Sequence, residues 1–288
     1  MIAVERATPA HFGEVLPLLR QFNNPSLGDD RWRSLFHYTW PSEDDTRGFL
    51  LRAEGRCVGF FGAIHFERDI AGRREKFANL TSWVVEPAFR NHSLRLLEAV
   101  TNIEGRTLHC FTPTPATHPL YARFGFSDLE TKWITLLPRL TRGFPGALLR
   151  HRFITNPGCI ASLLPDAMRA IYEHQRPHAA RHLLVRARGN RQCLVTFTRT
   201  RGARYPLAHV HSVSDPELFT AASAAVRWRL MLAAHAAAVV VDARLLAGRA
   251  QPASREAAIT RKAVFRSGTL RADQIDGLYS ELVLLGSV

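Results

Sequence analysis

Two stretches of this chain, about 130 residues apart, carry the same order of short segments. Each has two strand-like runs joined by a tight turn, at residues 51–60 and at residues 185–197. In each, a strand end then meets a proline that opens a helix, at residues 84–87 and 213–216, and an apolar strand follows. Any two strand–turn–strand units look alike in isolation. The shared order nevertheless favours a duplication, so we expect two related α/β units.

Length and composition agree with this expectation. The chain has 288 residues, 46% hydrophobic and 22% charged, which suits two domains of ordinary globular composition. A mainly disordered chain, a collagen-like chain and a disulfide scaffold are excluded. The four scattered cysteines form no C-x-x-C pair, which argues against a zinc ribbon and fits a reducing compartment.

No segment predicts export or membrane insertion. The first six residues lack the basic and apolar regions of a secretory signal. The most apolar stretch, residues 230–246, contains charged residues and is too short to span a bilayer. We therefore expect a cytoplasmic protein without a membrane span.

Hydrophobic periodicity and turn residues outline the first unit. They predict, in chain order, a strand at 2–7, helices from Pro9 and from Asp29, strands at 49–53, 57–66 and 77–85, a helix at 93–102, a strand at 107–111, a short helix around Tyr121 and a long final strand at 126–137. The predicted fold class is α/β, with two units in tandem, each a mixed, mostly antiparallel sheet flanked by helices. The expected domains are 1–138, a helical and basic connector at 139–181, and a second unit at 182–288.

Charge is distributed unevenly between the two halves. Residues 1–140 hold 17 basic and 16 acidic residues, whereas residues 141–288 hold 21 and 9. The second half is therefore strongly basic, which indicates an anionic partner, although an arginine-rich genome gives the same composition. No nucleic-acid motif accompanies the charge, so no nucleic-acid partner is expected.

The junction between a strand and a helix at residues 83–95 is the sharpest local feature. Backbone N–H groups at a helix start lack partners within the helix, and the helix dipole adds positive potential there. Such a start binds anions, and a pyrophosphate suits it. This segment resembles the acyl-CoA-binding motif of the GNAT acetyltransferase superfamily, R-x-x-G-x-G/A. Arg90 matches the first position, while Ser93 and Arg95 replace the two small residues.

The resemblance implies acetyl-CoA or another acyl-CoA as co-substrate, and no metal. Ser93 is small enough to keep the backbone approachable, while Arg95 is a larger departure that can contribute charge to the phosphates. The implied cofactor-binding residues are Val84, Val85, Arg90, Asn91, His92, Ser93, Leu94, Arg95 and Thr117.

A second match lies at residues 114–126, which resemble the family's helix N-x-x-x-x-x-Y-x-x-x-G-F. The resemblance implies that Tyr121 protonates the departing CoA thiolate and that Gly125-Phe126 begins the last strand. The usual Asn is absent, and Thr114 or Thr117 can substitute for it. The alternative for Tyr121 is an ordinary core aromatic on a helix face.

In the second unit the corresponding junction carries two carboxylates. Asp215 is predicted to cap the helix, with Pro216 at its first position and Glu217 beside it. Two carboxylates repel a pyrophosphate, so CoA is expected to bind the first unit only. The arrangement resembles tandem GNAT enzymes in which one unit turns over substrate.

A general base is less evident. Residues 79–85 contain no carboxylate, which leaves Glu67 and His65 as candidates, each with the alternative of an ordinary strand residue. His174, His178 and His182 are spaced as metal ligands can be, but Pro177 interrupts the helix that would align them.

These observations predict an acyltransferase that moves an acetyl or other acyl group from acyl-CoA to an amine of a small or medium acceptor. A backbone N–H near Val85 would polarise the thioester carbonyl, and the acceptor would occupy the groove between the units. One alternative is a long-chain acyltransferase whose donor is an acidic acyl carrier protein, docked on the basic half. Another is a non-catalytic CoA-binding regulatory protein.

Overall fold

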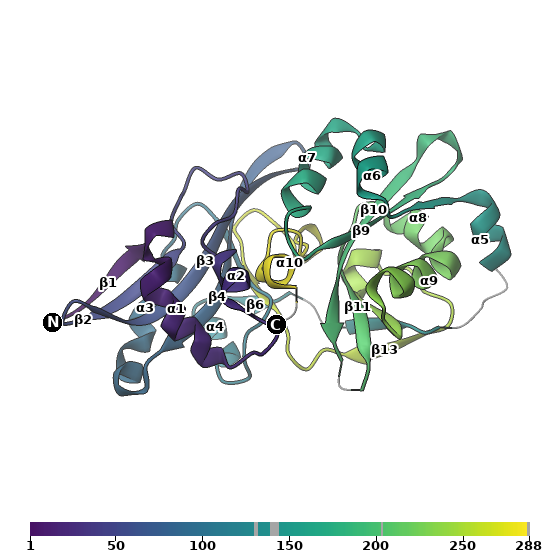
Figure 1. Ribbon diagram of the computed structural model, residues 1–288. Coiled ribbons are helices and arrows are strands. Elements are labelled where there is room, and N and C mark those ends of the chain that lie inside the picture. The colour runs from purple at the N-terminus through teal and green to yellow at the C-terminus, as the bar shows by residue number, and fades with distance from the viewer. Residues whose placement is uncertain (130–131, 139–143, 203, 287–288) are drawn as a thin grey trace.

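The computed structural model describes residues 1–129, 132–138, 144–202 and 204–286. It holds two seven-stranded mixed sheets. Figure 1 shows that helices lie on the faces of the sheets. The first sheet has the spatial order β1 (Ile2–Ala7), β2 (Gly48–Ala53), β3 (Arg56–Ile70), β4 (Arg73–Val85), β5 (Thr107–Cys110), β14 (Val264–Arg266), β6 (Ser127–Asp128). The second has the order β8 (Arg152–Ile154), β9 (Arg181–Arg186), β10 (Gln192–Arg201), β11 (Pro206–Val213), β12 (Ala238–Asp242), β7 (Lys132–Leu136), β13 (Ser254–Ala258).

The two sheets share one topology. In each, four strands run antiparallel in sequence, and the fourth then pairs in parallel with the fifth: β4 with β5 and β11 with β12. A parallel pair needs a crossover, which a helix supplies in both units. The predicted α/β class with two units in tandem is confirmed.

The last strands are exchanged between the sheets. The long strand predicted at 126–137 is wrong, because its residues divide into β6, at the edge of the first sheet, and β7, which pairs with β12 and β13 in the second. The vacant position beside β5 is filled by β14, from near the end of the chain. Residues 130–131, which would link the two parts, lie outside the described residues.

The division into domains at residues 138 and 182 therefore does not follow the sheets. The segment expected as a connector does carry three helices, α5 (Phe144–Arg150), α6 (Pro157–Leu163) and α7 (Asp166–Gln175). It also supplies β8, the edge strand of the second sheet. Residues 139–143, where that connector was expected to begin, lie outside the described residues.

Helices cover both faces of the first sheet. On one face lie α1 (Phe12–Leu19), α2 (Asp29–Arg33) and α10 (Glu281–Leu285), and on the other α3 (Ser93–Thr101) and α4 (His118–Arg123). The apolar side chains of α3 that face the sheet, Leu96, Leu97 and Val100, are fully buried, each worth roughly 1.5–3 kcal/mol. Leu94, near the start of the same helix, is 46% exposed.

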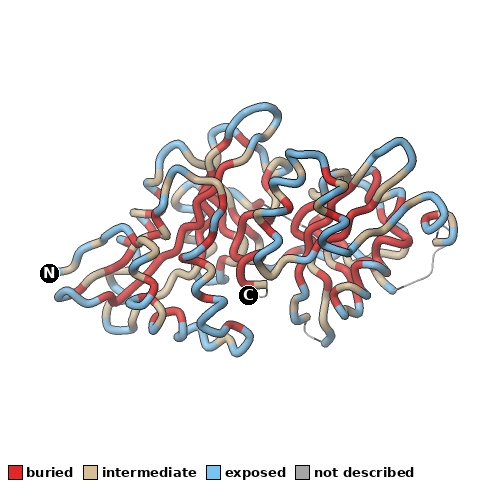
Figure 2. The backbone as a smooth tube through the Cα atoms, turned by 45° about the horizontal axis from the view of Figure 1, so that its top comes forward, coloured by how far each residue is buried: buried red, intermediate tan, exposed pale blue. Residues whose placement is uncertain are grey.

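The second sheet is covered by α8 (Pro216–Ala221) and α9 (Ser223–Ala234). α9 is apolar on most of its surface, and α5 packs against its outer side through Ala147. Figure 2 shows buried residues in both units and also in the region between them. Among the described residues, no helix has the length and apolarity needed to cross a membrane.

The carboxyl-terminal segment ties the two units together. The Asp276 carboxylate accepts hydrogen bonds from Arg68 of β3 at 2.6 Å and from Ser212 of β11 at 3.2 Å. Tyr279 packs edge-on against Trp40 with ring centroids 5.0 Å apart. One short segment thus contacts a strand of each sheet.

Candidate active site

The split between β4 and β5 forms the centre of the site. The two strands pair in parallel only from Phe77 with Thr107 to Asn79 with His109, and they diverge beyond that point. The pairing of β3 with β4 also shifts register near Gly62, and Ser82 adopts a positive φ of 54°. A bulge of this kind bends a strand and redirects its backbone groups.

A cavity of about 620 Å³ enters this split and extends to the second unit; we refer to it as the inter-unit cavity. Its first-unit wall includes Ser82, Trp83, Thr112, Thr117 and Tyr121. Its second-unit wall comes from the ends of β10 and β12, from the middle of β11 and from Trp133 of β7. The strand exchange therefore brings the second sheet to the mouth of the first unit's split.

Tyr121 presents a protonated phenol to the inter-unit cavity. The side chain is 2% exposed, packs against Phe126 at 5.1 Å, and forms a hydrogen bond with the Cys110 thiol. Burial, followed by the neighbouring Cys110, raises the pKa of Tyr121 well above its ordinary value. The hydroxyl is thus a proton donor at neutral pH.

Glu281, which the sequence analysis did not single out, lies beside this tyrosine. It is fully buried, and its Oε1 accepts a hydrogen bond from Thr112 at 2.8 Å, while its Oε2 has no partner among the described residues. Its backbone N–H donates to Asn79 at 3.1 Å. Burial raises the pKa of Glu281 to about 7. The only signal in the sequence is a single carboxylate within the apolar run 278–285.

The backbone of Val85 is directed toward the split. The N–H of Glu86 donates to Val58 of β3 at 2.9 Å. Successive N–H groups of a strand point to opposite edges, so the N–H of Val85 points to the edge where β5 has diverged. That is the orientation the sequence analysis expected for polarising a carbonyl.

The predicted pyrophosphate segment begins as a 3₁₀ helix, η3 (Pro87–His92), and continues into α3. The N–H of Ser93 is occupied by the Arg90 carbonyl, whereas Glu86 makes no side-chain cap. Arg95 donates a hydrogen bond to the Ile2 carbonyl of β1 at 3.2 Å. Of the predicted cofactor residues, Thr117 lines the inter-unit cavity and residues 84–95 do not.

Comparison with known proteins places this arrangement in a family. The model of the Acetyltransferase (GNAT) family matches residues 14–126, which include β2 to α4 and the split. Residues 14–126 are thus a GNAT domain. No curated protein sequence matches it significantly.

Solved GNAT structures share the fold over nearly the whole chain. A GCN5-related N-acetyltransferase from Anabaena variabilis ATCC 29413 is 12% identical, with a TM-score of 0.60, over 92% of this chain and 72% of that one. A probable N-acyltransferase from Enterococcus faecalis V583 is also 12% identical, with a TM-score of 0.59, over 94% and 74%. A tandem GNAT protein from the clavulanic acid biosynthesis pathway is 13% identical, with a TM-score of 0.51, over 92% and 98%.

In the second unit, side chains of the protein itself close the corresponding helix start. The Asp215 side chain caps α8 by accepting the N–H of Leu218 at 2.9 Å, as predicted from the sequence. Arg191 binds Asp215 at 2.6 Å and Glu217 at 2.8 Å. Side-chain carboxylates thus occupy the place where an anion would bind.

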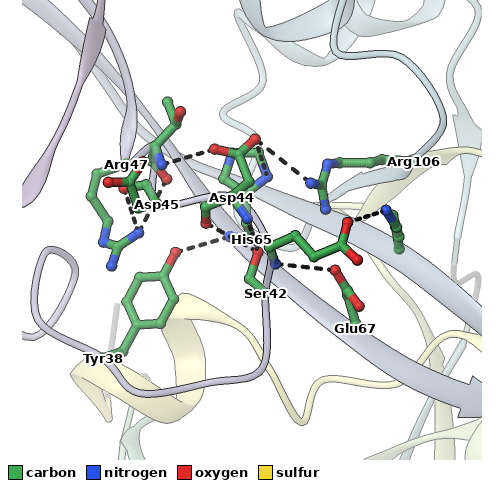
Figure 3. A network of polar contacts seen from close by, with 11 residues as sticks. Tyr38, Ser42, Asp44, Asp45, Arg47, His65, Glu67 and Arg106 are labelled. Atoms are coloured by element: carbon green, nitrogen blue, oxygen red, sulfur yellow. Dashed lines mark hydrogen bonds and ion pairs between the residues drawn. The ribbon is translucent and has the colours of Figure 1, made fainter.

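The two residues predicted as general bases lie away from Tyr121. His65 lines a different cavity, of about 360 Å³, with Asp44 and Arg106, and Figure 3 shows Glu67 beside the same network. Burial lowers the pKa of His65 to about 4, so its imidazole is a weak base. Burial acts to raise the pKa of Glu67, but the Glu43 N–H and Arg74 outweigh it and lower that pKa. Neither residue lines the inter-unit cavity.

The three evenly spaced histidines have separate surroundings. His174 bonds to the Tyr279 hydroxyl at 3.0 Å, His178 packs on Trp40, and His182 packs on Tyr172. Within the described part of the chain, no group of three or more His, Cys, Asp or Glu residues is arranged to hold a metal ion.

Proposed function

We propose that this GNAT protein transfers an acyl group, most simply acetyl, from acyl-CoA to an amine held in the inter-unit cavity. The observation that carries the proposal is the Tyr121 hydroxyl, which is buried, protonated and directed to a cavity that enters the β4–β5 split. GNAT membership supports acyl transfer from CoA as the general chemistry.

The donor would lie along the first unit. Backbone N–H groups near η3 and the start of α3, with the exposed Arg90, would bind the pyrophosphate. The thioester would then enter the split, where the N–H of Val85 would stabilise the negative charge on its carbonyl oxygen. The amine nitrogen forms the new C–N bond, the C–S bond breaks, and Tyr121 donates its proton to the departing thiolate.

Glu281 and Thr112 support a route for the proton that the amine loses. Thr112 lines the cavity, and its hydroxyl already donates to the Glu281 carboxylate. The amine could pass a proton to the Thr112 oxygen while the Thr112 proton moves to Glu281. A carboxyl group with a pKa near 7 suits this role at neutral pH. Glu67 and His65 remain the alternative bases, with less support from their positions.

The test of this function is Tyr121→Phe, which keeps the ring and removes only the hydroxyl. With acetyl-CoA and a panel of amines, release of CoA thiol should fall about 100-fold in kcat, because a positioned proton donor contributes about that much. Acetyl-CoA affinity by calorimetry and the melting temperature should stay close to those of the wild type. An unchanged kcat, with chemistry rate-limiting, would assign Tyr121 to packing.

The same assay on the wild type, with acyl carrier protein conjugates offered beside acyl-CoA, separates the two alternatives. A carrier-protein-dependent enzyme would turn over acyl carrier protein conjugates but not acyl-CoA. A regulatory protein would bind acetyl-CoA without turnover. The comparisons give no support to either.

A further inference from the structure

The second unit contributes a cationic wall to the inter-unit cavity. Arg201 comes from the end of β10, Arg244 from η5 (Ala243–Leu246), and Arg261 from the segment between β13 and β14. Three separate segments thus bring arginines to one cavity. Convergence of this kind is not explained by an arginine-rich composition, which would scatter the charges.

Two of these charges lack a nearby carboxylate. The acidic side chain in the cavity wall, Asp242, is bound by Arg244 at 2.6 Å. Within the described residues, neither Arg201 nor Arg261 has a carboxylate oxygen within 4.0 Å, and both residues are exposed. The cavity therefore has an excess of positive charge on its second-unit side.

The remaining wall is aromatic or neutral. Trp83 stacks on Phe61 at 4.9 Å, and Trp133 packs edge-on against His209 at 5.0 Å. Burial lowers the pKa of His209 to about 4, so this imidazole carries no charge at neutral pH. The cavity wall thus offers aromatic faces to an apolar or aromatic body, in addition to the arginines.

We propose that the acceptor of this enzyme carries an anionic group, a carboxylate or a phosphate, which Arg201 and Arg261 bind while the amine faces Tyr121. This inference rests on the proposed function, because it assigns the inter-unit cavity to the acceptor. The phosphates of the donor are expected elsewhere, at residues 84–95, which do not line the cavity. Guanidinium groups bind carboxylates and phosphates through paired hydrogen bonds.

The test uses tryptophan fluorescence as a binding signal that does not depend on catalysis. Trp32, Trp83 and Trp133 line the cavity. The probes are 3-phenylpropionate, 2-phenylethyl phosphate and 3-phenylpropylamine, which share a phenyl body and differ in charge. The wild type should bind an anionic probe at least tenfold more tightly than the amine, and the two anions will distinguish carboxylate from phosphate.

Variants show which arginines cause the preference for anionic probes. Arg201→Gln and Arg261→Gln should each reduce affinity for the preferred anion about tenfold and leave the amine unchanged. Arg199→Gln is the matched control, because Arg199 is an exposed residue of the same strand that does not line the cavity. Equal affinity for amine and anion, or no binding of either anion at millimolar concentration, would overturn the inference.

Acetyl-CoA titrations of the same variants keep the two proposals apart. The affinity for acetyl-CoA should be the same in the wild type, Arg201→Gln and Arg261→Gln. A loss of acetyl-CoA affinity in these variants would mean that the arginines bind the donor's phosphates, which overturns the acceptor inference and leaves the acyltransferase intact. No acetyl-CoA binding to the wild type would instead refute the proposed function, while the probes still measure the anion preference.

Discussion

The two strand-to-helix junctions of this protein differ although their surroundings match. In both units an arginine near the preceding tight turn binds the carboxylate before the proline: Arg56 with Glu86 and Arg191 with Asp215, each at 2.6 Å. Only Asp215 also accepts a backbone N–H of the following helix. A difference of one methylene in this side chain thus accompanies the difference between an uncapped helix start and a capped one.

This comparison teaches that two units of one topology can share an ion pair and still differ in the cap of the helix that follows. Glu86 has one more methylene than Asp215, and its helix begins with a 3₁₀ turn rather than directly as an α-helix. In the second unit Glu217 adds a further negative charge. The surroundings of the two junctions differ as well, because Glu281 lies at the split of the first unit, whereas the Asp242–Arg244 pair lies at the end of β12 in the second.

The largest expected effect comes from placing a carboxylate in the open junction. Ser93→Glu should abolish measurable acetyl-CoA binding, since it puts a negative charge where the pyrophosphate is expected. Asp215→Ala, in the closed junction, should leave that affinity within a few-fold. Calorimetric titration of both variants measures this, and equal weakening would show that the units do not differ in CoA binding.

The next effect concerns Glu281, with its pKa of about 7 in the folded chain. An unfolded glutamate has a pKa near 4.3, so between about pH 4.5 and 7 the folded chain holds a proton that the unfolded chain has lost. Its contribution to the free energy of unfolding therefore falls as pH rises through this window.

Glu281→Gln should remove that contribution. Buried histidines such as His65 have the opposite effect, because they lower the free energy of unfolding as pH falls below about 6.5. The quantity to measure is therefore the difference in free energy of unfolding between variant and wild type. In urea unfolding the variant should gain stability relative to the wild type from pH 5 to pH 7.5. A difference that does not vary with pH would mean that Glu281 titrates normally.

The smallest effect tests the cap itself. Asp215→Ala should lower the free energy of unfolding by about 1 kcal/mol, because a helix N–H loses its partner. Glu86→Ala, which removes an exposed ion pair without a cap, should change stability less. Thermal unfolding measures the loss of stability in the two variants. A larger loss for Glu86→Ala would contradict the view that only Asp215 caps a helix.

Much of the local structure could be predicted from the sequence. Hydrophobic patterns and turn residues reflect interactions between residues close in the chain. They correctly predicted the strands at 2–7, 49–53 and 107–111 and the helix from Ser93. The cap at Asp215 could be predicted because an aspartate before a helix commonly accepts the backbone N–H three residues further along. Tyr121 was placed by its resemblance to a family motif, and the structure directs it to the inter-unit cavity.

The sequence by itself determined the two α/β units, their order and the contrast between their helix starts, since these depend on contacts between residues close in the chain. Only the tertiary structure decided which sheet receives β7 and β14, because strand pairing over more than 100 residues leaves no local pattern. That exchange brings Trp133 to the inter-unit cavity, and the carboxyl-terminal segment that follows β14 brings Glu281 to the split of the first unit. The physical reason is that the burial and the charge of a side chain depend on the residues that pack around it. Around Tyr121 these include Cys110 and Phe126, which are near it in the chain, and Glu281, which is 160 residues away.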